Sequence, residues 1–132
     1  MRINAPGQGA KASTYRLSIW DTAGQEQHHC LNKIYYRGAL GALIVYDITD
    51  LDSFSRMAGW VKELRQQCGQ ALPIIIVGNK SDLENSRQIK LKDAEDYARR
   101  LGLDHFSASA RTGQNVVQIF QQLTESKFRA YS

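Results

Sequence analysis

Runs of apolar residues predict the strands of this chain. Residues 39–48 and 73–78 are almost wholly apolar, which is typical of strands that are buried on both faces of a sheet. Residues 15–21 alternate between the two faces of a strand, so we expect a half-buried strand that ends in the acid Asp21. A short strand is also expected over residues 105–108.

Apolar residues that recur every three or four positions predict helices between these strands. The first helix is expected to begin after an N-cap at Asp52 or Ser53 and to stop at Gly69. The second is expected over 91–101 and the third over 113–129. The inward face of the second helix is predicted to consist of Leu91, Ala94, Ala98 and Leu101.

Alternation of strands with single helices favours an α/β fold with a doubly wound, mostly parallel sheet between two helical layers. The 132 residues, 42% of them hydrophobic, suit a single domain, in which residues 1–13 are predicted to form a flexible lead-in or hairpin loop. Ligands of such sheets bind outside the carboxyl ends of the strands. Polar clusters at Asp21, Asn79 and Ser109 all fall at such ends, which predicts one composite site.

Charge and cysteine content narrow the functional class. The net charge of +4 comes from scattered Lys and Arg, which argues against a nucleic-acid-binding protein. Cys30 and Cys68 stand alone without metal-ligand spacing and favour a reducing compartment, the cytoplasm. His28 and His29 are better explained as solvated residues than as a metal pair. The chain lacks an apolar run long enough to span a membrane and a C-terminal lipidation cysteine.

The turn at residues 79–82 offers the chemistry of a base-recognition site. An ionised carboxylate only accepts hydrogen bonds, so Asp82 suits guanine, which presents adjacent N–H donors, and would face an acceptor on adenine. The stem of Lys80 can lie along a purine face. An ordinary surface turn would use the same residue types, and that alternative stays open on this motif alone.

A candidate phosphate-binding motif follows the first predicted strand, whereas the N-terminal glycines do not form one. Asp21 followed three residues later by Gly24 can hold a cation and offer a backbone N–H to phosphate oxygens. The glycines at residues 7–11 do not have the spacing of a Walker A loop, and they precede a strand where that loop precedes a helix. We interpret them as a hairpin loop.

Taken together, these motifs resemble the Ras superfamily of small GTPases. The resemblance covers Tyr15 to about Phe128 and rests on the segments 20–26, 79–82 and 109–111 in this order. Within the superfamily, segments 35–39 and 45–49 make the chain similar to Rab proteins of the endosomal subgroup. The resemblance implies a P-loop NTPase G domain that binds GTP or GDP with Mg²⁺ and hydrolyses GTP.

Residue roles follow from the resemblance by position. Asp21 is implied to hold Mg²⁺, while Ala23 and Gly24 contribute to nucleotide binding and Gly24 donates its N–H to the γ-phosphate. Gln25 is implied to orient the attacking water as the catalytic residue. The residues implied to surround the guanine are Asn79, Lys80, Asp82, Ser109, Ala110 and Arg111, the last in place of the usual lysine.

The resemblance also implies partners and a place in the cell. Trp20 falls on the polar face of its predicted strand, and with Tyr35 it is implied to contact effector proteins. Exchange factors and GTPase-activating proteins are the further partners expected of a Rab protein. Its function would be the regulation of vesicle traffic at the cytosolic face of endosomal membranes, although the tail that anchors such proteins is not in this chain.

The family pattern before the second strand is not found in this sequence. The Walker A loop and the first switch are missing, so we expect an N-terminally truncated G domain. A different possibility is a shortened Rab-like interaction module that binds partners without nucleotide. A response-regulator-like domain is a weaker third reading, because the acid pair that it requires at the end of its first strand is missing.

Overall fold

The computed structural model of the chain describes residues 2–6, 12–16 and 41–131, with side chains over residues 41–125. The central feature is a parallel three-stranded sheet in the order β3 (Ala42–Asp47), β4 (Ile74–Asn79) and β5 (Asp104–Ser107). The strands predicted from the apolar runs are therefore confirmed, with β5 shifted by one residue. Because each crossover contains helical structure, the parallel α/β fold class is confirmed as well.

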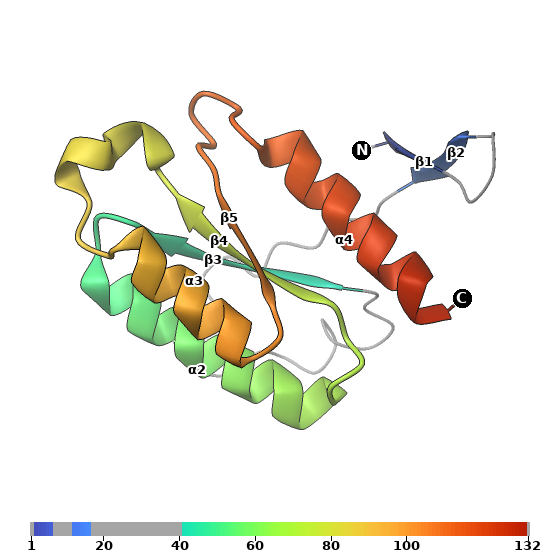
Figure 1. The fold of residues 1–132 in the computed structure, drawn as a ribbon, viewed down its shortest axis with the longest axis horizontal. Coiled ribbons are helices and arrows are strands. Elements are labelled where there is room, and N and C mark those ends of the chain that lie inside the picture. Colours follow the sequence, from blue (N-terminus) through green and yellow to red (C-terminus); the bar gives the residue numbers. More distant parts are fainter. Residues whose placement is uncertain (1, 7–11, 17–40, 132) are drawn as a thin grey trace.

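Helices cover both faces of this sheet (Figure 1). On one face, α2 (Leu51–Cys68) and α3 (Leu91–Arg100) bury a large cluster that includes Ile44, Met57 and Ile76. On the other face, Ile119 of α4 (Val116–Tyr131) packs with the side chains that alternate with the first set, such as Ile75. β4 is thus buried on both faces, which explains its continuous run of isoleucine and valine.

The helix boundaries refine the expected ones. The N-cap of α2 is Asp50, whose carboxylate accepts from the N–H of Asp52 at 3.0 Å, and not Asp52 or Ser53 as predicted. Gly69 ends the helix at a positive φ of 76°, as expected. The last predicted helix begins only at Val116, because Gly113 and Asn115 both adopt positive φ.

Two of the four residues predicted to face inward from α3 are exposed. Leu91 and Leu101 are 40% and 44% exposed, whereas Ala94 and Ala98 are buried. Leu101 lies beyond the last residue of the helix, so the helical spacing no longer directs it toward the sheet. The buried positions beyond the two ends of α3 are taken by Ile89 and Leu103.

The N-terminal residues form more structure than the predicted loop. β1 (Arg2–Pro6) pairs antiparallel with β2 (Ala12–Arg16), and β1 contacts α4 (Figure 1). The strand predicted over 15–21 thus begins earlier, at Ala12, and its residues 17–21 lie outside the described part of the chain. No helix in the described ranges is long and apolar enough to cross a membrane.

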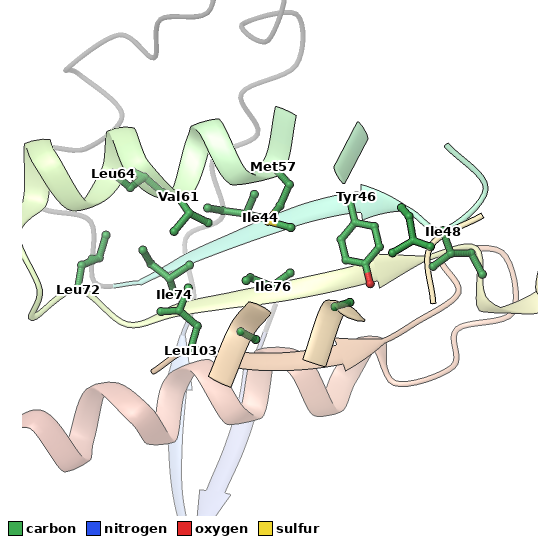
Figure 2. Packing of buried hydrophobic residues seen from close by; sticks show 13 residues of the cluster. Ile44, Tyr46, Ile48, Met57, Val61, Leu64, Leu72, Ile74, Ile76 and Leu103 are labelled. Atoms are coloured by element: carbon green, nitrogen blue, oxygen red, sulfur yellow. The ribbon is translucent and has the colours of Figure 1, made fainter. Parts of the chain in front are cut away.

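Tyr46 crosses the sheet above β4. Its side chain is 2% exposed, and Figure 2 shows it extending from β3 with the hydroxyl group over β4. The strand register places Gly78 directly beside Tyr46. A Cβ atom at Gly78 would lie 2.7 Å from Tyr46 Oη and 2.9 Å from its Cζ, so the crossing depends on a residue without a side chain.

We expect Gly78→Ala to lower the free energy of unfolding by about 1–3 kcal/mol, because the added methyl group overpacks a buried ring. The ring cannot swing away easily, since Phe54 packs edge-on against it at 5.1 Å between centroids. Chemical denaturation measures the change. The matched control is Gly59→Ala in α2, where a Cβ meets nothing within 4 Å. That variant should raise the free energy of unfolding by roughly 0.5–1 kcal/mol. Equal effects at the two glycines would refute the steric argument.

Candidate functional site

The carboxyl ends of the three parallel strands meet at one edge of the sheet. Asp47, the last residue of β3, is the register partner of Asn79, the last residue of β4. Gly78 is in turn the partner of Ser107, which ends β5. The loops that follow the three strands therefore start side by side, and the predicted clusters at Asn79 and Ser109 come together as expected from the topology.

The loop after β4 turns sharply at Lys80. This residue has a φ of 68°, in the left-handed region that non-glycine residues rarely adopt. The turn leads into a 3-10 helix, η2 (Ser81–Ser86), which was not expected from the sequence. The N–H of Ser81 donates to the carbonyl of Ala108 at 3.0 Å, so the turn is fastened to the end of β5.

Side-chain hydrogen bonds join the loops after β4 and β5. The Ser109 hydroxyl donates to Oδ1 of Asp82 at 2.8 Å, and the N–H of Ala110 donates to Oδ1 of Asn79 at 3.0 Å. The Ser81 hydroxyl forms a third bond, at 2.8 Å, to Oε1 of Gln114. Each of these bonds connects residues at least 27 positions apart, so the two loops form one unit.

Ser109 is the buried centre of this unit. Its side chain is fully inaccessible, and its oxygen also accepts from the N–H of Thr112 at 3.1 Å. The carbonyl of Ser109 accepts from the N–H of Gly113 at 2.8 Å, which closes the loop on itself. A buried hydroxyl with both donor and acceptor functions satisfied holds its neighbours in a single arrangement.

Asp82 faces outward from the joined loops. Ser109 occupies Oδ1, while Oδ2 makes no hydrogen bond within the described part of the chain. Ala110 and Arg111 are exposed beside it, and the N–H of Ala110 is already bonded to Asn79. The exposed carboxylate oxygen is an acceptor for a ligand that presents N–H donors.

An ion pair links the end of β3 to the same loops. Nζ of Lys80 lies 2.6 Å from Oδ2 of Asp47, and Oδ1 of Asp47 accepts from both the N–H and the hydroxyl of Thr49. Burial alone would raise the pKa of Asp47, but the hydrogen bonds from Lys80 and Thr49 outweigh it and the pKa is lowered. The same bond raises the pKa of Lys80. The stem of Lys80 is thus held by Asp47 at the edge of the site.

Sequence reasoning missed Asp47 and Gln114 as members of this cluster. A signal existed for Asp47, because it closes an apolar strand in the same way that Asn79 does. Gln114 gave none, since its contact with Ser81 depends on the folded course of both loops.

The remaining predicted site residues lie outside the described part of the chain. These are Trp20, Asp21, Ala23, Gly24, Gln25 and Tyr35. Among the described residues, no group of three or more His, Cys, Asp or Glu side chains is arranged to hold a metal ion. The roles given to the six residues therefore stay predictions.

Comparison with known proteins agrees with this arrangement. The model of the Ras family matches residues 7–129 of the chain. The chain belongs to the Ras family. A parallel sheet with helices on both faces is the fold that this membership implies.

Rab-21 proteins are among the similar relatives within the family. The chain is 52% identical over 108 residues to Ras-related protein Rab-21 of Dictyostelium discoideum, covering 82% of this chain and 51% of that protein. It is 49% identical over 107 residues to human Ras-related protein Rab-21, covering 81% and 48%. Ras-related protein RHN1 of Nicotiana plumbaginifolia is 45% identical over 118 residues, covering 89% and 59%. The chain thus spans about half the length of the Rab-21 relatives it matches, and it is a Rab-type member of the Ras family.

The Asp47–Lys80 pair should make stability depend on acidity. Because the pKa of Asp47 in the folded chain is below its ordinary 3.8, the ionised carboxylate stabilises the fold above about pH 4. This contribution to the free energy of unfolding is lost as the pH falls through the folded-state pKa. We expect Asp47→Asn to be less stable than the wild type at pH 6, and the difference to shrink by pH 2.5. Urea unfolding across this range measures it, with Asp93→Asn on the exposed side of α3 as control. A constant difference would contradict the pKa argument.

Proposed function

We propose that this chain reads the base of a guanine nucleotide with the joined loops after β4 and β5. The observation that carries the proposal is the set of hydrogen bonds that presents Asp82 and Asn79 at the carboxyl edge of the sheet. A site held in one arrangement before binding loses little entropy when the ligand arrives. Membership of the Ras family supports a nucleotide as the ligand.

Asp82 is the residue that would select guanine. Its free oxygen and the neighbouring Oδ1 can accept from the ring imino and exocyclic amino groups of guanine. Adenine would place an acceptor against this carboxylate, which leaves buried polar groups unpaired and is strongly disfavoured. The apolar stem of Lys80, whose ammonium group pairs with Asp47, would cover a face of the base. Asn79, Ser109, Ala110 and Arg111 would complete the site.

The phosphates and the hydrolysis of GTP belong to the part of the proposal that rests on the resemblance. Asp21 would hold Mg²⁺, which supplies charge neutralisation to the phosphates when bound. Gly24, with Ala23 beside it, would donate a backbone N–H to the γ-phosphate, and Gln25 would orient the attacking water. The Rab relatives support these roles through the similarity of sequence alone.

The cellular role is proposed on the same ground. Similarity to Rab-21 proteins supports a switch in endosomal vesicle traffic that acts at the cytosolic face of the membrane. Trp20 and Tyr35 would contact effectors, and exchange factors and GTPase-activating proteins would be the regulators. The chain spans about half the length of these relatives, so this cellular role is a proposal.

Substitution at Asp82 tests base recognition. We expect Asp82→Asn to lose about tenfold to a hundredfold in affinity for fluorescent GDP, because a charged hydrogen bond to the base is removed. The new amide offers a donor beside an acceptor, which matches xanthine, so the variant should gain affinity for XDP. Fluorescence titration with Mg²⁺ measures both ligands, and circular dichroism checks folding.

The matched control is Asp104→Asn, an exposed carboxylate at the start of β5 and away from the site. It should leave both affinities unchanged. If Asp82→Asn loses affinity for GDP without gaining affinity for XDP, the assigned base contact is contradicted. A folded wild-type chain that binds no guanine nucleotide would overturn the proposal and favour the interaction module that binds partners without nucleotide.

A further inference from the structure

A tyrosine–histidine pair joins the two outer strands of the parallel sheet. Oη of Tyr46 on β3 lies 2.7 Å from Nε2 of His105 on β5, and the two rings are 5.9 Å apart. β4 lies between these strands, and the hydroxyl passes over it at Gly78 (Figure 2). The bond therefore spans all three strands, from the residue before the end of β3 to the second residue of β5.

Each partner lies on a strand that leads into a loop of the proposed base site. Tyr46 is followed by Asp47, which holds Lys80. His105 lies four residues before Ser109, whose hydroxyl binds Asp82. A bond between Tyr46 and His105 thus fixes the separation of the strand ends from which both sides of the site extend.

The direction of this hydrogen bond depends on the protonation of His105. Burial raises the pKa of Tyr46 to about 12, so the tyrosine keeps its hydrogen, and it donates this hydrogen when neutral His105 is the tautomer that leaves Nε2 free to accept. When His105 gains a proton, Nε2 becomes a donor, and the Tyr46 hydrogen must find another acceptor inside the core. Protonation therefore removes the bond as it stands in this structure.

The surroundings of His105 oppose its protonation. Burial lowers the pKa of His105, Glu95 of α3 acts against this change, and Arg87 after η2 adds to it. Tyr46 of β3 is the hydrogen-bonding neighbour, and Phe54 of α2 packs edge-on against the tyrosine ring. His105 is thus neutral at neutral pH and accepts a proton only in acid.

We propose that Tyr46 and His105 are positioning residues of the base site and that protonation of His105 loosens the two loops and weakens guanine-nucleotide binding, an inference that rests on the proposed function. The pair touches no reacting atom. Its effect passes from β3 to Asp47 and Lys80, and from β5 to Ser109 and Asp82.

Amide NMR of the ligand-free chain tests the positioning directly. As the pH is lowered from 8 through the midpoint of the His105 ring titration, we expect the amide signals of Ser81 and Ala110 to shift with that same midpoint. His105→Gln should abolish these shifts, because its amide oxygen accepts from Tyr46 but does not titrate. The inference would be overturned if the amide signals of Ser81 and Ala110 do not shift with the His105 titration, or if they shift equally in His105→Gln.

Nucleotide affinity supplies the second measurement. Wild-type affinity for fluorescent GDP should fall about threefold to tenfold as the pH is lowered through the measured midpoint of the His105 ring titration, the change expected for one hydrogen bond. His105→Gln should show only the smaller change due to titration of the nucleotide itself. Tyr46→Phe, which keeps the ring, should bind more weakly at pH 7.5 and lose the histidine-dependent change.

The two measurements separate the failure of this inference from that of the proposed function. If the wild type binds GDP with the same pH profile as His105→Gln, the positioning role is wrong and the guanine site stands. If no variant binds GDP at any pH, the proposed function is wrong, and so is the predicted effect of pH on nucleotide binding. The amide titration then decides whether Tyr46 and His105 position the loops.

Discussion

The pairing of β4 with a parallel strand on each side is the constraint on which the rest of the structure depends. It forces each connection to cross the sheet through helical structure, and it places the ends of β3, β4 and β5 at one edge. Burial of β4 on both faces fixes its register, because a shift by one residue would exchange the two hydrophobic clusters. The fixed register therefore also fixes the distances between the points where the loops at this edge begin.

Polar groups at that edge are held by partners on neighbouring loops as well as by their own segments. Asp82 and Asn79 on one loop bind Ser109 and Ala110 on the other, and Lys80 binds back to Asp47. Such long-range bonds cost loop entropy during folding and repay it only after the sheet has formed. The site is therefore a product of the completed fold.

Sequence patterns predicted the parallel sheet, its strands and the approximate helices, because apolar runs and helical spacing reflect burial directly. The N-cap of α2 was misplaced because Asp50, Asp52 and Ser53 are all suitable caps, and only the folded geometry selects one. Leu91 and Leu101 were misplaced because spacing cannot show where a helix stops contacting the sheet. Motifs brought Asn79 and Asp82 to attention, but the contacts of Asp47 and His105 required coordinates.

The close approach of Tyr46 to Gly78 ties positions of the chain together in evolution. Replacing Tyr46 by phenylalanine removes the nearest atom but leaves the ring carbon Cζ, which would still crowd a methyl group at residue 78. A side chain at Gly78 requires a shorter residue at position 46 and a small shift of Ile48, whose Cγ2 would lie 3.2 Å from the new Cβ. The shorter residue also removes the partner of His105. Substitutions at positions 46, 78 and 105 should therefore be found in combination among related sequences.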